Sequence, residues 1–158
     1  MSTSLPKTIR KRPAIDADET FVSNLIHLTM QSFVFEEWPD DSVACEDYWL
    51  AKHFDRDKTQ IVELEGRPVG AITTTVKATS IYIDQVHLLP LAQGKGIGKW
   101  LITDVITLAK EMKLSVSLTV LNSNIPAQEL YKRLGFIEVH SNDSHRKHME
   151  FHHQADSM

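Results

Sequence analysis

Three glycines at alternate positions are the clearest chemical signal in the sequence. Residues 88–99 read Leu-Leu-Pro-Leu-Ala-Gln-Gly-Lys-Gly-Ile-Gly-Lys, so an apolar segment runs straight into a glycine-rich turn. Glycine lets the backbone approach a ligand closely. A helix that starts from such a turn points N–H groups and the positive end of its dipole at the same place. The segment therefore predicts an anion site, and pyrophosphate is its natural occupant.

Two better-known phosphate loops do not fit these residues. A dinucleotide fingerprint starting at Gly94 needs glycine at Lys99, and one starting at Gly96 needs glycine at Leu101. A nucleoside triphosphate loop needs Gly-Lys followed by Ser or Thr, whereas Lys95 and Lys99 are followed by Gly and Trp. The glycines by themselves leave open a tight turn that binds nothing.

The turn must be positioned by the elements around it. Hydrophobic periodicity predicts strands at residues 8–14, 60–64, 68–77, 79–89, 115–120, 136–139 and 148–151 and helices at 17–33, 42–54, 98–112 and 125–134. The order β-α-α-β-β-β-α-β-α-β-β predicts an α+β fold with a mixed, mostly antiparallel sheet flanked by helices. In the second helix we expect apolar contacts from Val43, Trp49, Leu50 and Phe54.

Strand alternation gives the segment 79–89 two faces. Tyr82, Asp84, Val86 and Leu88 should share one face, and Gln85, His87 and Leu89 the other.

Two segments carry a resemblance to a known family. Gln-x-x-Gly-x-Gly at residues 93–98, after a strand ending in Leu-Leu-Pro, resembles the acetyl-CoA motif of the GNAT family of N-acetyltransferases. Asn-x-x-Ala-x-x-x-Tyr-x-x-x-Gly-Phe at residues 124–136 resembles a later motif of that family, in the right order and at a fitting distance. The resemblance covers about residues 60–139. It departs at Leu91, where many members have a charged residue and where we expect the side chain to face solvent.

The resemblance implies a donor site. The pyrophosphate of acetyl-CoA would be held by the loop residues Gln93, Gly94, Lys95, Gly96, Ile97, Gly98 and Lys99. The backbone around Leu88 and Leu89 would pair with the pantetheine arm, in a gap that a bulge opens between this strand and the next. Asn124 would cap its helix and contact the pantetheine.

The resemblance also suggests the catalytic groups. Tyr131 occupies the place of a family tyrosine near the thiol, where a phenol can act as general acid; the alternative is a packing tyrosine. Asp84 best fits the place of the family's base, unless it is a structural carboxylate. His87 is a second candidate, and some members need no base because they bind a free amine. Transfer would be direct, without a covalent enzyme intermediate.

The acceptor site is expected between the first two helices and the far end of the sheet. Residues 33–41 place four carboxylates beside three aromatic rings, and Phe35, Glu37 and Trp38 are the candidate contacts to a cationic amine. The competing interpretation is a solvated acidic loop.

Composition limits the remaining choices. The 158 residues, 42% hydrophobic and 24% charged, predict one soluble domain over 1–158 with a core at about 8–151. The net charge of -4 and the lack of a long apolar run predict no nucleic acid and no membrane partner. Residues 1–13 do not resemble a secretory signal, and Cys45 is the single cysteine, so we expect a cytoplasmic protein in which Cys45 packs rather than reacts.

Metal binding is not expected. The C-terminal histidines match no metal motif and are read as exposed side chains: His140, His145, His148, His152 and His153.

Together these features predict an acetyl-CoA-dependent N-acetyltransferase acting on a small-molecule or peptide amine. The alternative is a non-catalytic acyl-CoA-binding regulatory module. Family members commonly dimerise, so a homodimer is an open expectation.

Overall fold

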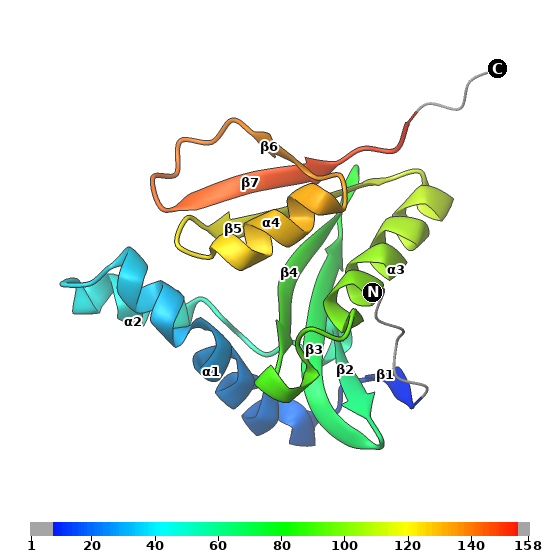
Figure 1. Cartoon of the computed structure of the whole chain (residues 1–158), viewed down its shortest axis with the longest axis horizontal. Coiled ribbons are helices and arrows are strands. Elements are labelled where there is room, and N and C mark those ends of the chain that lie inside the picture. The colour runs from blue at the N-terminus through cyan, green and yellow to red at the C-terminus, as the bar shows by residue number, and fades with distance from the viewer. Residues whose placement is uncertain (1–7, 155–158) are drawn as a thin grey trace.

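The computed structural model describes residues 8–154, and its backbone forms a seven-stranded sheet covered by helices on both faces (Figure 1). The expectations for residues 1–7 and 155–158, including the start of the segment tested for a secretory signal, lie outside this range. Spatial strand order is β1-β2-β3-β4-β5-β7-β6, with β4 and β5 parallel and every other neighbouring pair antiparallel. The strands are Ile9–Pro13 (β1), Thr59–Leu64 (β2), Arg67–Val76 (β3), Ser80–Leu88 (β4), Ser115–Leu121 (β5), Ile137–Val139 (β6) and Arg146–Phe151 (β7).

Four α-helices occur in the predicted order, and the predicted α+β fold is confirmed. They are Glu19–Glu37 (α1), Ser42–Leu50 (α2), Ile97–Met112 (α3) and Ile125–Arg133 (α4). Three short 3₁₀ turns were not predicted: Asp16–Asp18 (η1), Arg56–Lys58 (η2) and Pro90–Ala92 (η3). Within the described residues, no helix is long and apolar enough to cross a membrane.

Two cores lie on opposite faces of the sheet because strand residues alternate between them. Val62 of β2 and Ile72 of β3 join the core beneath α3 and α4. Their neighbours Ile61 and Ala71 join the core beneath α1 and α2.

A bulge interrupts the pairing of β3 with β4. Thr73 pairs with Gln85 and Thr74 with Ile83, which leaves Asp84 as the extra residue. Beyond this point β4 leaves β5, because their parallel pairing runs only from Ser80 to Ile83. The bulge and the gap implied by the family resemblance are therefore present (Figure 1).

The same bulge corrects the predicted faces of β4. Ile83, Val86 and Leu88 pack against one core, so Val86 and Leu88 do not share a face with Tyr82 and Asp84. Simple alternation fails here because one inserted residue shifts the phase of everything after it. The predicted second face is correct: His87 contacts α1, and Leu89 packs against the core beneath it.

The first two helices also differ from expectation. The first helix continues to Glu37, so the predicted loop at residues 33–41 is largely the last turn of α1, which ends before Pro39. The second ends at Leu50 instead of Phe54, and its buried residue is Tyr48, while Val43 and Leu50 are exposed. A nine-residue helix lying at the edge of the fold presents only one narrow stripe to the core.

Candidate active site

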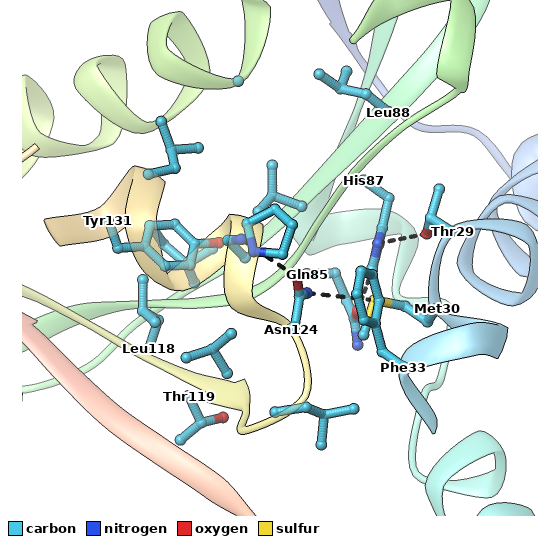
Figure 2. A pocket seen from close by; sticks show the side chains of 18 of the residues that line it. Thr29, Met30, Phe33, Gln85, His87, Leu88, Leu118, Thr119, Asn124 and Tyr131 are labelled. Atoms are coloured by element: carbon cyan, nitrogen blue, oxygen red, sulfur yellow. Dashed lines mark hydrogen bonds between the residues drawn. The ribbon is translucent and has the colours of Figure 1, made fainter. Parts of the chain in front are cut away.

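A cavity of about 680 Å³ occupies the opening between β4 and β5. Its walls come from the second half of β4, the glycine loop with the start of α3, α4, α1 and the chain near the end of α2 (Figure 2). The size suits a ligand of the cofactor or drug class. The cavity therefore connects the predicted glycine loop with the predicted catalytic residues.

The glycine loop has a backbone that other residues adopt with difficulty. Gly94 and Gly96 have φ angles of 75° and 80°, and Gly96 directly precedes α3. The first hydrogen bond of α3 runs from Trp100 N–H to the Gly96 carbonyl at 3.0 Å. In the described part of the chain, no backbone carbonyl meets the N–H groups of Gly94, Lys95 or Gly96. These donors stand at a helix N-terminus, where an anion binds favourably.

Gly98 is a glycine that the protein's own packing does not require. Its φ is not positive, and an added Cβ would meet Leu130 Cδ2 at 3.7 Å and Leu88 Cδ1 at 3.9 Å, which are ordinary contacts. The absence of a side chain at this cavity-lining position leaves room for a ligand.

The backbone of Leu88 faces the opening, whereas that of Leu89 does not. Leu89 N–H donates to the Val69 carbonyl at 2.7 Å, and its own carbonyl accepts from Ala92 N–H at 2.9 Å. In this register Gly70 and Leu88 form a non-hydrogen-bonded antiparallel pair. The N–H and C=O groups of Leu88 therefore point away from β3. By alternation the same holds for Val86. Because β5 has already diverged, the free edge of β4 at Val86 and Leu88 lines the cavity.

Gln93 ties the loop to this edge. Its side-chain amide donates to the Leu88 carbonyl at 3.0 Å. Its observed contact is therefore with the protein, and it fixes where the loop begins relative to the end of β4.

Tyr131 lies on α4 and reaches into the cavity (Figure 2). Its ring packs against Phe136 with a centroid separation of 5.6 Å, and the residue is 6% exposed. Burial raises the pKa of Tyr131 to about 12. Within residues 8–154, Tyr82 is the one tyrosine whose phenol forms a hydrogen bond, so the proton of the Tyr131 phenol has no partner among these residues. The phenol is therefore neutral at ordinary pH and available as a hydrogen-bond donor.

Asp84 and His87 both line the cavity but differ in chemistry. The Asp84 carboxylate accepts a 2.7 Å hydrogen bond from the Thr75 hydroxyl. The His87 ring nitrogens are both engaged, Nδ1 with Thr29 Oγ1 at 2.9 Å and Nε2 with Gln85 Oε1 at 2.6 Å. Burial, and secondarily the charge of Lys52, lower the pKa of His87 to about 4. His87 is therefore neutral and weakly basic.

Asn124 caps α4, as predicted. Its side-chain oxygen accepts from Ala127 N–H at 3.3 Å, and its amide nitrogen lies 3.9 Å from the sulfur of Met30 on α1 (Figure 2). The residue lines the cavity, so it joins α4 to α1 across the opening.

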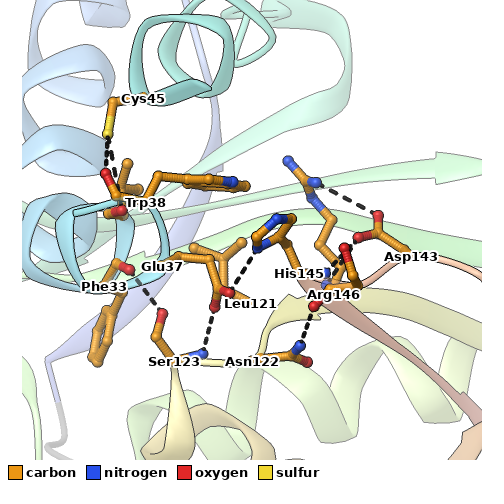
Figure 3. A network of polar contacts seen from close by, with 12 residues as sticks. Phe33, Glu37, Trp38, Cys45, Leu121, Asn122, Ser123, Asp143, His145 and Arg146 are labelled. Atoms are coloured by element: carbon orange, nitrogen blue, oxygen red, sulfur yellow. Dashed lines mark hydrogen bonds and ion pairs between the residues drawn. The ribbon is translucent and has the colours of Figure 1, made fainter. Parts of the chain in front are cut away.

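The three predicted acceptor residues are not brought into the cavity. Phe35 is 65% exposed on α1. Glu37 accepts from Ser123 N–H at 2.9 Å and pairs with His145 Nδ1 at 2.9 Å (Figure 3). Trp38 lies against His145, with ring centroids 4.9 Å apart. Glu37 and Trp38 thus connect the end of α1 to the turn before α4, which holds Ser123, and to the segment between β6 and β7, which holds His145.

Tyr48, Lys52 and Arg146 are among the cavity residues that were not singled out from the sequence. Lys52 Nζ lies 4.8 Å, and Arg146 Cζ 5.9 Å, from the centroid of the Tyr48 ring. No local motif connects these residues, because only the packing of α2 against the start of β7 brings them together. The sequence signal that could have pointed to this group was Tyr48, an aromatic residue on a short helix.

Other candidate groups lie elsewhere. The Cys45 thiol donates to the Trp38 carbonyl at 3.4 Å and does not line the cavity (Figure 3). Over residues 8–154, no three His, Cys, Asp or Glu side chains lie together in a way that could hold a metal ion. Leu91 is 60% exposed, as expected.

Comparison with known proteins agrees with this geometry. Residues 22–136 match the model of the acetyltransferase (GNAT) family. The chain is 26% identical over 125 residues to the peptidyl-lysine N-acetyltransferase YjaB of Salmonella typhimurium, covering 79% of this chain and 70% of that protein. It is also 26% identical over 137 residues to the thialysine N-epsilon-acetyltransferase of Bos taurus, covering 76% and 81%.

A solved structure shares the fold. The PaiA N-acetyltransferase of Thermoplasma acidophilum, in complex with coenzyme A, superposes with a TM-score of 0.73 at 17% identity, covering 92% of this chain and 99% of that one. The chain belongs to the acetyltransferase (GNAT) family and is an acetyltransferase, which confirms the resemblance.

Proposed function

We propose that the protein transfers the acetyl group of acetyl-CoA directly to a primary amine, in a complex that holds both substrates. One observation carries the proposal: the opening between β4 and β5 has a free strand edge along one side and a helix N-terminus with unpaired N–H groups at its end. An extended, amide-bearing arm with a pyrophosphate fits both features. The relatives act, by their names, on peptidyl-lysine and thialysine, and one structural neighbour holds coenzyme A.

Donor binding uses the residues of the loop and the strand edge. The N–H groups of residues 94–99 hold the pyrophosphate, and the backbone of Val86 and Leu88 pairs with the pantetheine amides. Gln93 donates to the Leu88 carbonyl and thereby holds the loop against the end of β4. The thioester then lies near Tyr131, between β4 and α4.

Transfer follows from this placement. The amine nitrogen attacks the thioester carbonyl, and a backbone N–H of β4 near Leu88 that does not pair with the pantetheine stabilises the oxygen as it becomes negative. The carbon–sulfur bond breaks, and the Tyr131 phenol donates a hydrogen bond or its proton to the leaving sulfur. Burial raises the pKa of Tyr131 to about 12. The same burial disfavours an unprotonated thiolate beside the phenol, so the proton affinities of both groups are raised together.

The proton of the amine is assigned to Asp84. Its carboxylate lines the cavity and is oriented by Thr75, and a water molecule can carry the proton to it. His87 is the weaker candidate, since both its nitrogens are engaged and its pKa is lowered to about 4. Positive charge nearby assists deprotonation: burial, followed by Arg146, lowers the pKa of Lys52, and the same surroundings act on a bound ammonium.

The test is a calorimetric titration with acetyl-CoA, followed by a panel of primary amines assayed for release of free CoA thiol. Binding with amine-dependent thiol release supports the proposal. Binding without release over a broad panel favours the alternative of an acyl-CoA-binding regulatory module. If acetyl-CoA does not bind at all, the donor site described for residues 93–99 is refuted.

A further inference from the structure

Two cations stand at the acceptor side of the cavity. Lys52 follows α2 and Arg146 begins β7, so both lie toward the sheet face covered by α1 and α2, away from α3 and its glycine loop. Both line the cavity, and both lie against the ring of Tyr48. The two cations lie against the same ring, and the charge of Arg146 helps to lower the pKa of Lys52, after burial.

Neither charge has a short contact with a carboxylate in the described residues. Among the described residues, Lys52 forms no ion pair with a carboxylate. Arg146 has Asp143 at 3.5 Å, a long contact, and otherwise lies against the rings of Trp38 at 5.5 Å and Tyr48 at 5.9 Å. The remaining carboxylate at the cavity is Asp84, whose hydrogen bond comes from Thr75.

Two partly buried positive charges that act on each other cost free energy unless an anion joins them. A simple ammonium substrate would be repelled by the pair and attracted only by Asp84. An acceptor with its own negative group satisfies both sides, because its anion meets the cations while its amino group faces Asp84. An exposed acidic segment at residues 33–41 would select the opposite kind of substrate, but its Glu37 is already paired with His145.

We infer that the acceptor is a small amine that carries a carboxylate, such as an amino acid, and that Lys52 and Arg146 bind this carboxylate while the amino group lies toward Asp84. The inference rests on the proposed acetyl transfer for the identity of the amino group but not for the anion site. Arg146 offers the geometry for a paired hydrogen bond to a carboxylate, and Lys52 adds a single strong donor.

The test uses a product-like pair that differs in one charge. CoA-saturated protein is titrated with N-acetylglycine and, separately, with its neutral counterpart N-acetylglycinamide, following chemical shifts of backbone amides. We expect the acid to bind about tenfold more tightly than the amide, as for a charged hydrogen-bonded pair. Lys52→Gln and Arg146→Gln should each remove most of that preference and leave amide binding unchanged.

Lys147→Gln is the matched control, because Lys147 neighbours Arg146 on β7 but pairs with Glu138 and does not line the cavity. It should retain the full preference. Equal binding of acid and amide to the wild-type protein overturns the inference, and so does a preference that survives both cavity substitutions. Thermal melts of each variant identify misfolding. If Lys52→Gln does not fold, Lys52→Met tests the same position.

The donor and acceptor claims fail in different ways. If Lys52→Gln weakens acetyl-CoA instead of N-acetylglycine, the cations serve the donor and the inference is wrong. The same acid-and-amide comparison is run without CoA. A charge preference that depends on Lys52 supports the anion site even if CoA fails to bind, and no preference in either condition refutes it even if CoA binds.

Discussion

The Thr75 hydroxyl donates a 2.7 Å hydrogen bond to the Asp84 carboxylate, from the strand beside the bulge to the residue that forms it. Bulged residues are freed from the regular alternation of a strand, so their side chains can be directed to a site. Here the hydrogen bond from β3 fixes the carboxylate at the mouth of the cavity. One inserted residue therefore both opens the sheet and supplies the candidate base.

Asp84→Asn should lower kcat/KM for the amine by about a hundredfold at neutral pH, since general bases contribute roughly 10²–10⁴-fold. The acetyl-CoA dissociation constant should not change. The effect should shrink at high pH, where the amine loses its proton to water. Asp57→Asn, at an exposed carboxylate outside the cavity, is the control. A variant with wild-type kcat/KM at every pH would remove Asp84 from the mechanism.

Tyr131→Phe should lower kcat by about a hundredfold at saturating acetyl-CoA, because it removes only the group that stabilises the leaving sulfur. The ring that packs against Phe136 remains, so acetyl-CoA affinity and stability should be retained. Tyr82→Phe makes the same chemical change at a phenol that does not line the cavity itself and bonds at 2.8 Å to the cavity residue Thr119, and it should keep full activity. Equal losses in both variants would contradict the assignment.

Stability should fall at alkaline pH. Burial raises the pKa of both Tyr48 and Tyr131 from 10.0 to about 12. A raised folded-state pKa gives stability that is fully present below pH 10 and is lost as pH rises toward 12. Each tyrosine contributes at most about 3 kcal/mol to this loss, at 1.36 kcal/mol per pKa unit. Denaturant titrations from pH 9 to 12 should show a smaller decline for Tyr131→Phe, and an unchanged decline would exclude Tyr131 as a source.

Gly70→Ala should destabilise the protein by about 1–3 kcal/mol and weaken acetyl-CoA binding. An added Cβ would lie 2.5 Å from Leu88 Cδ2 and 2.7 Å from the His87 carbonyl oxygen, so β4 must move. Gly98→Ala provides the contrast, since its Cβ meets only ordinary contacts: it should keep the stability and lose affinity for acetyl-CoA. Chemical denaturation and calorimetry measure the two effects, and normal affinity in Gly70→Ala would speak against a donor site along β4.

Glu37 should behave as a brace for the fold. In a double-mutant cycle of Glu37→Gln and His145→Gln, we expect a coupling of about 0.5–1 kcal/mol in unfolding free energy, modest because His145 is 39% exposed. Glu37→Gln keeps a side-chain oxygen that can still accept from Ser123 N–H, so the cycle reports mainly the pair with His145. The earlier hypothesis of a substrate contact predicts instead a higher amine KM in Glu37→Gln and no effect of His145→Gln, so amine kinetics on all three variants decide between them.

Hydrophobic periodicity was sufficient to predict the order of strands and helices, because apolar residues recur regularly on the buried face of most of them. Ile61 and Val62, and again Ala71 and Ile72, divide between the two cores as alternation requires. Alternation could not reveal that Asp84 is an inserted residue, since a one-residue shift of phase leaves no mark in composition. The faces of Val86 and Leu88 were therefore wrong, although the bulge itself was implied by the family resemblance.

The glycine-loop end of the cavity could be predicted from the sequence, and the end that holds Lys52 and Arg146 could not. Residues 93–99 form a continuous segment whose glycines have a physical purpose in themselves. Lys52 and Arg146 come from distant segments, and only tertiary packing around Tyr48 makes them neighbours. Glu37 was predicted as a substrate contact for the same reason. Its observed partners, Ser123 and His145, lie far along the chain and could not be recognised from the local sequence.

The short contact between β4 and β5 divides the sheet into two leaves. In the described part of the chain, one leaf holds β1 to β4, the other holds β5, β7 and β6, and their strands pair only between Ser80–Ile83 and Ser115–Leu118. Beyond that point the facing edges of β4 and β5 carry backbone N–H and C=O groups that do not pair with a neighbouring strand. If the proposed donor lies there in an extended form, its amides take the place of the missing length of strand and connect the two parts of the sheet. Donor binding would then also restrain the movement of one part of the sheet relative to the other.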